Sequence, residues 1–83
     1  MYARTARQLR KLIAKNPGES PSVFLPDQSF AAFCYDRYTA ADLKSAFNRD
    51  PDPDDCRKWR LSPSEWRENI EMAFIARSEA ERR

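Results

Sequence analysis

Residues 61–66, Leu61-Ser62-Pro63-Ser64-Glu65-Trp66, carry the signals with which a helix begins. Ser62 stands at the N-cap position, where its side chain can accept a hydrogen bond from a free N–H of the first turn. Pro63 suits the first helical position, and Glu65, three residues after the cap, can return a hydrogen bond to the cap N–H. The apolar pair Leu61 and Trp66 flanks the cap and fixes the angle at which the chain enters the helix.

The same order of residues occurs twice upstream. Tyr38-Thr39-Ala40-Ala41-Asp42-Leu43 has Thr39 at the cap and an acid three residues later, with an apolar residue on either side. Asp52-Pro53-Asp54-Asp55 is a third version without the apolar pair. Together these starts predict helices over 40–47, 53–60 and 63–80.

The helix over 63–80 has apolar residues on more than one face. At 100° per residue, one face is made of Trp66, Ile70, Ala73, Phe74 and Arg77. A second face is made of Met72, Ile75 and Glu79. This width predicts that the helix packs against two neighbours.

The first half of the chain divides less clearly. Residues 2–16 predict a basic amphipathic helix whose apolar side is Tyr2, Ala6, Leu9 and Ile13. Residues 17–26, which begin with Pro17-Gly18, have the composition of a linker. For residues 22–38 we favour a helix over 28–37 with Asp27 as its cap, and the alternative is a small hairpin that pairs 22–25 with 30–35.

We therefore expect a single domain, 1–83, that is mainly α. It would be a small bundle of four to five short helices, with residues 27–83 as the helical body. Only six β-branched residues are present among 83, which is too few for a sheet of any size. An α+β fold with a hairpin within 22–35 is the alternative.

The residue types that are missing exclude several kinds of chemistry. The chain has no histidine, so the Ser–His and Cys–His nucleophile arrangements are excluded, and only one glycine, so there is no phosphate-cradling loop. Cys34 and Cys56 are predicted to be reduced thiols of a cytoplasmic protein rather than a bridge. The acidic run 50–55 lacks the glycine of a calcium loop and has Leu61 where that loop needs glutamate. We expect no enzyme, no cofactor and no metal, and no apolar run is long enough to cross a membrane.

Charge is strongly segregated along the chain. Residues 1–18 carry five bases and no acid, residues 19–56 carry eight acids and three bases, and residues 57–83 carry seven bases and five acids. A net charge of only +2 therefore hides a dipolar molecule.

Three sets of charged residues are candidate contact sites. The first is a basic stripe at helical spacing: Arg4, Arg7, Lys11 and Lys15. The second surrounds Trp59, which is expected to belong to the core or, alternatively, to stack on a nucleic-acid base: Arg57, Lys58 and Arg60. The third is an acidic loop, whose carboxylates are expected to cap a short helix and to present negative charge: Asp50, Asp52, Asp54 and Asp55.

These features favour a small non-catalytic protein that acts by binding. In length and in its lack of catalytic apparatus the chain resembles small accessory proteins of phages and other mobile elements, of which anti-CRISPR proteins are one class. The first hypothesis is a protein-interaction module or inhibitor with a protein partner. The alternative is a small nucleic-acid-binding protein that uses the basic stripe, and a homodimer is left open.

Overall fold

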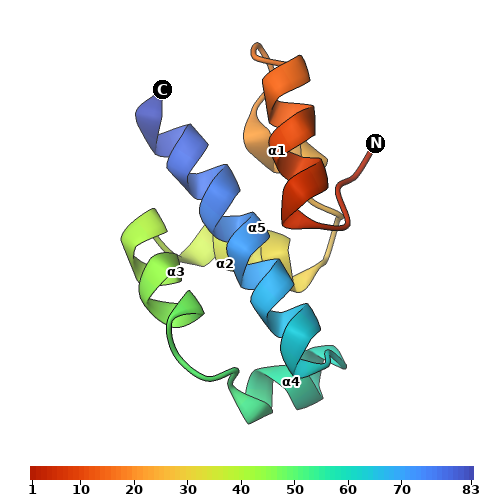
Figure 1. Ribbon diagram of the computed structural model, residues 1–83, viewed down its shortest axis with the longest axis vertical. Helices are drawn as coiled ribbons and strands as arrows, with labels where there is room; N and C mark the ends of the chain where they lie inside the picture. The colour runs from red at the N-terminus through yellow and green to blue at the C-terminus, as the bar shows by residue number, and fades with distance from the viewer.

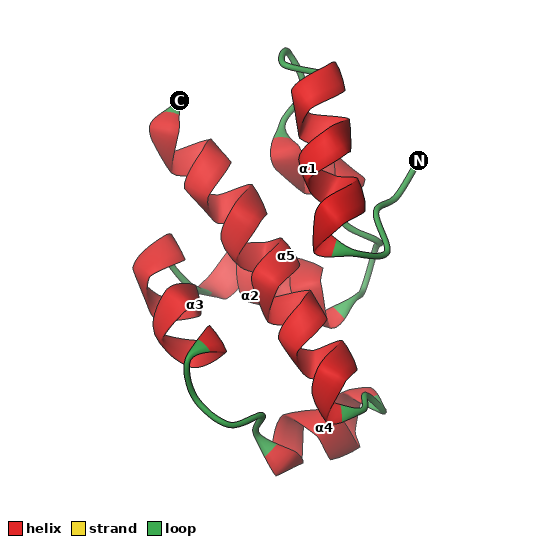
Figure 2. Cartoon of the chain, viewed as in Figure 1, coloured by secondary structure: helices red, strands yellow, loops and turns green.

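The computed structural model describes residues 1–83, and it is helical throughout, with no strand (Figure 2). Its elements are α1 (Ala6–Lys15), a single 3₁₀ turn η1 (Pro21–Phe24), α2 (Phe30–Arg37), α3 (Ala40–Phe47), α4 (Pro53–Trp59) and α5 (Pro63–Arg82). The prediction of a mainly α bundle is confirmed. The hairpin alternative is wrong, because residues 22–25 lie in and after η1 and residues 30–35 lie in α2.

Helix α5 is the centre of the fold, and every other element contacts it. Figure 1 shows α1 and α3 on opposite sides of α5, α2 behind it, and α4 at its N-terminal end. The other elements are each ten residues long or shorter. Isolated helices of this length are marginal in water, so their stability comes from packing on α5.

The core has two parts, one on each apolar face of α5. On one face, Met72 and Ala76 pack with Ala3, Ala6, Leu9, Phe24, Leu25 and Ala31. On the other face, Trp66, Ile70 and Ala73 pack with Phe30, Cys34 and Leu43. The prediction that this helix packs against neighbours on two faces is confirmed.

The predicted capping boxes of α3 and α5 are both present. Thr39 Oγ1 accepts from Asp42 N at 3.1 Å while Asp42 accepts from Thr39 N at 3.2 Å. Ser62 and Glu65 exchange the same pair of hydrogen bonds at 3.1 and 2.8 Å. Each box satisfies two of the N–H groups that the first turn leaves without intrahelical partners.

Two helices begin later than the sequence predicts. Helix α1 starts at Ala6 rather than at residue 2, because Thr5 caps it by accepting from Gln8 N at 3.1 Å. Helix α2 starts at Phe30 with Ser29 as its cap rather than Asp27, and the preceding Gln28 adopts a left-handed backbone with φ of 60°.

The segment 17–26 packs more closely than a linker would. Pro21, Phe24 and Leu25 are buried. The carbonyl of Phe24 accepts a hydrogen bond from Ala3 N at 2.8 Å, so the chain before α1 runs along η1 instead of continuing the helix.

Polar side chains of α5 complete the ends of other helices. Free N–H groups at the N-termini of α1, α2 and α3 donate to Glu68 (from Ala6 N, 2.8 Å), Asn69 (from Ala31 N, 3.1 Å) and Glu81 (from Ala40 N, 3.0 Å). At C-terminal ends, Arg67 donates to the carbonyl of Phe47 and Arg77 to that of Tyr38. Two carboxylates and one amide oxygen thus meet the positive ends of helices, and two guanidinium groups meet negative ends.

Candidate functional site

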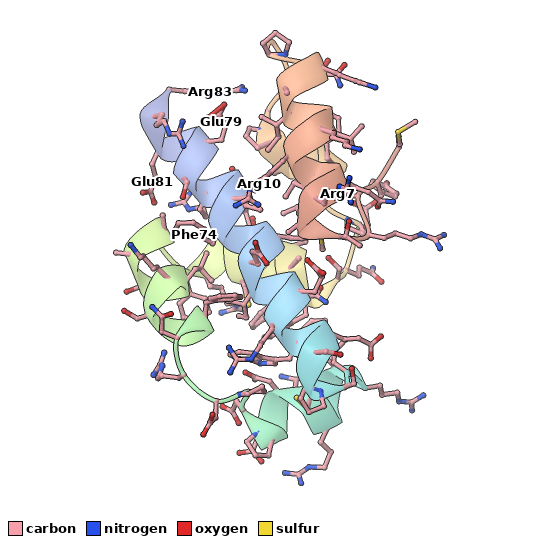
Figure 3. All side chains as sticks on the ribbon, in the orientation of Figure 1. Arg7, Arg10, Phe74, Glu79, Glu81 and Arg83 are labelled. Carbon is pink, nitrogen blue, oxygen red and sulfur yellow. The ribbon has the colours of Figure 1, made fainter.

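The basic residues of the N-terminal segment form an exposed, largely unpaired face on α1. Arg4, Arg7, Lys11 and Lys15 are all exposed, and none of them forms an ion pair. Arg10 is the exception, since its guanidinium reaches toward α5 and pairs with Glu71 at 3.5 Å (Figure 3). The structure places all four predicted stripe residues at the surface, but only Arg7, Lys11 and Lys15 lie on α1. Arg4 precedes the helix, because Thr5 caps it. Helix α1 keeps its other side, with Ala6 and Leu9, in the core.

A shallow groove runs beside this basic face. It has a volume of about 330 Å³ and is lined by Met1, Tyr2, Arg4, Gln8, Lys11, Leu12 and Lys15. Three of the four predicted stripe residues line it, and Arg7 lies outside. Tyr2 is 51% exposed and Met1 92%, so two large apolar side chains stand next to three cations.

The position of Tyr2 corrects the prediction from the sequence. Tyr2 was expected on the buried side of a helix starting at residue 2, but it precedes the helix and donates its hydroxyl to Asp27 Oδ2 at 3.2 Å. The signal was Thr5, a good N-cap residue. A cap at that position ends the helical register before Tyr2 and leaves the tyrosine free to reach the surface.

The second basic set lies far from the first. Arg57, Lys58 and Arg60 are exposed on and after α4, at the opposite end of the molecule from α1 (Figure 1). Arg57 forms an ion pair with Asp54 of its own helix. The two basic sets therefore do not form one continuous surface.

Trp59 is half-buried and packs against the core, which is closer to the first interpretation of the sequence than to a ring presented to solvent. Its ring lies 5.5 Å from that of Phe30 and 5.2 Å from that of Phe33, centroid to centroid. These tilted contacts attach α4 to α2. The neighbouring bases flank the ring in solvent.

The acidic run divides between capping and exposed carboxylates. Asp52 caps α4 by accepting from Asp54 N at 2.9 Å, and the half-buried Asp55 accepts from Trp66 Nε1 at 3.2 Å. Asp50 is exposed and forms no hydrogen bond or ion pair within the chain. The expected capping role is confirmed for Asp52.

Both cysteines are free, as predicted. Cys34 is buried on α2, and burial, with a smaller contribution from the nearby charge of Asp55, raises the pKa of its thiol to about 12. The thiol is therefore protonated at neutral pH, which makes it a poor nucleophile. Its role in the structure is to fill the core beside Leu43 and Trp66.

None of the helices combines the length and the apolar character that a membrane crossing requires. Comparisons with protein-family models, with curated proteins and with solved structures found no match to this chain. The arguments for its function therefore rest on the surfaces described above.

Proposed function

We propose that the protein is a small non-catalytic binding protein whose contact surface is the basic face of α1. It would act as a protein-interaction module or inhibitor, of the kind that phages and mobile elements use against host proteins, as anti-CRISPR proteins do. The observation that carries the proposal is the set of four exposed and unpaired cations, Arg4, Arg7, Lys11 and Lys15. The first 18 residues hold no acid that could offset them.

A solvated helix face normally mixes charges of both signs, and α1 does not. A cluster of positive charges accelerates the encounter with an acidic surface and disfavours basic partners. Met1 and Tyr2 add exposed apolar area at the edge of the same face. A tyrosine beside basic residues is typical of the anchors that dominate binding energy at protein interfaces.

The test is a charge reversal with a matched control. The double variant Arg7→Glu/Lys11→Glu reverses two exposed charges on α1. The control Lys44→Glu/Lys58→Glu makes the same change in net charge on α3 and α4. We expect both variants to retain the helical circular dichroism of the wild type, because all four side chains are exposed.

Binding to the protein partner is expected to fall by about tenfold or more in the α1 variant, because like charges then face each other across the interface. It is expected to stay near the wild-type value in the control. Equal affinity of the wild type and Arg7→Glu/Lys11→Glu would refute the assignment to α1, and so would a loss confined to the control.

A second candidate function, nucleic-acid binding, is favoured by Tyr2. A tyrosine that is half exposed among Arg4, Lys11 and Lys15 can stack on an unpaired base while the cations hold phosphates. The modest net charge and the separate position of the α4 bases favour the protein partner instead.

Fluorescence anisotropy of labelled duplex DNA and single-stranded RNA, over a series of salt concentrations, distinguishes the two candidates. If phosphates are the ligand, affinity falls steeply with salt, and the slope flattens in Arg7→Glu/Lys11→Glu. Tyr2→Ala would then weaken RNA binding by several-fold through lost stacking. Because we propose a protein partner, we expect no binding of either nucleic acid near physiological salt.

We also propose that the protein acts in the cytoplasm. The support is that Cys34 and Cys56 are free thiols in a chain without disulfides, which is typical of reducing compartments.

A further inference from the structure

A cavity lies on the side of α5 away from α1. Its volume is about 670 Å³, it is open to solvent, and it is lined by residues of α2, α3, the connection 48–52, the start of α4 and α5. In Figure 1 the connection between α3 and α4 arches away from α5 at this place. Ligand pockets of proteins commonly fall in this range of volume.

The floor and the rim of the cavity differ in chemistry. The floor is made of apolar side chains from three helices, among them Phe30, Phe33, Leu43 and Ile70. The rim carries four carboxylates and one base: Asp42, Asp50, Asp52, Asp55 and Arg49.

The four carboxylates are not equally available. Asp42 and Asp52 cap helices, and Asp55 accepts from the indole of Trp66. Asp50 forms no hydrogen bond or ion pair, and Arg49 forms no ion pair. A ligand that enters the cavity therefore meets an apolar surface, an excess of negative charge and one carboxylate without a partner in the chain.

We propose that this cavity binds an arginine side chain carried by a partner protein. An arginine has an apolar stem for the floor and a planar guanidinium that hydrogen-bonds to carboxylates through two donors. The chain already pairs arginines with aromatic rings: Arg37 lies 4.4 Å from the ring centroid of Phe33, and Arg77 lies 5.3 Å from that of Tyr35. An acidic rim over an apolar floor complements this side chain in charge and in polarity.

The inference goes beyond the proposed function and does not depend on it, because α1 contributes no residue to the cavity. A partner that used both surfaces would contact the molecule on opposite sides of α5.

The experiment is a titration of the ¹⁵N-labelled protein with the peptide acetyl-Gly-Arg-Leu-Gly-amide, followed by amide chemical shifts. The control peptide carries citrulline in place of arginine, which keeps the shape and removes the charge. We expect saturable shifts confined to residues that line the cavity and α2–α3, and binding at least about threefold weaker for the citrulline peptide. Shifts confined to α1, or equal affinity for the two peptides, would overturn the proposal.

Two substitutions of opposite expected sign separate binding from a structural effect. Asp50→Asn is expected to lower the affinity for the arginine peptide about threefold. Arg49→Gln is expected to raise that affinity, because it removes the one cation of the rim. Asp36→Asn, an exposed residue of α2 that does not line the cavity, is the control and should leave the affinity unchanged. Changes of the same sign in Asp50→Asn and Arg49→Gln would contradict the proposal.

Butylguanidine titrated alone tests the source of the cation. We expect it to bind more weakly than the peptide, because it lacks the neighbouring backbone and leucine. If it binds as tightly as the peptide, the cavity is a site for a small free cation, and the assignment to a partner protein is wrong.

Discussion

At the scale of single residues, Glu65 shows how a local pattern in the sequence becomes a measurable property. Its carboxylate accepts from Ser62 N, and Glu65 N donates to Ser62 Oγ. Hydrogen bonding to Ser62, mainly to its backbone N–H, lowers the pKa of Glu65 from its ordinary value of 4.5. The ionised form is therefore favoured in the folded protein relative to the unfolded chain.

This shift predicts the sign of a pH effect on stability. Because the folded-state pKa is the lower one, the stabilisation by Glu65 is fully present above pH 4.5 and is lost as the pH falls through the folded-state pKa. The variant Glu65→Gln can keep the hydrogen bond to Ser62 N but cannot titrate. Urea unfolding at pH 7 and at steps below pH 4.5 gives the free energy of unfolding of the wild type and of Glu65→Gln, and hence the difference between them. As the pH falls, we expect the wild type to lose stability relative to Glu65→Gln. If the free energies of unfolding of the two proteins change in parallel with pH, the prediction is wrong.

At the scale of elements, α5 organises the fold through its polar side chains as well as its apolar faces. Glu68, Asn69 and Glu81 accept from the first turns of three different helices. These hydrogen bonds help to fix where each short helix begins relative to α5. The bonds to Glu68 and Asn69 are partly buried, and an N–H group left there without a partner destabilises the fold. Helices α1 to α3 are thus oriented by hydrogen bonds as well as by packing.

Replacing Glu68 tests this role. Glu68→Ala leaves the N–H of Ala6 without its partner, and we expect it to lower the free energy of unfolding by about 1–2 kcal/mol. Glu79→Ala on the same helix breaks no hydrogen bond to another helix; the polar contact it removes is an ion pair with Arg82 that spans 3.9 Å. We expect it to change the free energy of unfolding by less than about 0.5 kcal/mol. Urea unfolding, followed by circular dichroism, gives both values. Indistinguishable midpoints for the two variants would show that α5 does not cap α1 in solution.

The elements also show how far the sequence alone reaches. The starts of α3 and α5 were predictable, because Thr39 and Asp42, or Ser62 and Glu65, make their contacts within one turn. The start of α1 was also marked locally, by Thr5, which caps the helix by accepting from Gln8 N. The course of the chain before it was not, because Tyr2 and Ala3 are placed by contacts with Asp27 and Phe24, more than 20 residues away in the chain. Such long-range contacts do not appear in the local periodicity.

The same distinction holds for the candidate surfaces. The exposed basic stripe on α1 could be predicted, because a helix with one apolar side presents the other to solvent. The groove beside it could not, because Tyr2 lines it only through the early chain segment along η1. The cavity of about 670 Å³ could not be predicted either, because it depends on how α2, α3 and α5 pack and on the course of the 48–52 connection.

At the scale of the whole molecule, the charge asymmetry of the sequence becomes a spatial one. Unpaired cations cover α1 on one side of α5. The carboxylates of residues 50–55 lie by α4 and the cavity on the other side, where the exposed bases Arg57, Lys58 and Arg60 partly offset them. Such a molecule is oriented by the field of a charged partner before contact, and the effect weakens as salt increases. The central claim is that the α1 face makes the contact with the partner.

One measurement tests that claim most directly. The wild type, Arg7→Glu/Lys11→Glu and Lys44→Glu/Lys58→Glu are each immobilised, and proteins bound from nuclease-treated lysate of the organism that encodes the chain are quantified at physiological salt. The account predicts a protein that is retained by the wild type and the α3/α4 variant and lost from the α1 variant. Retention of the same protein by all three forms, or its loss only from Lys44→Glu/Lys58→Glu, would contradict the account.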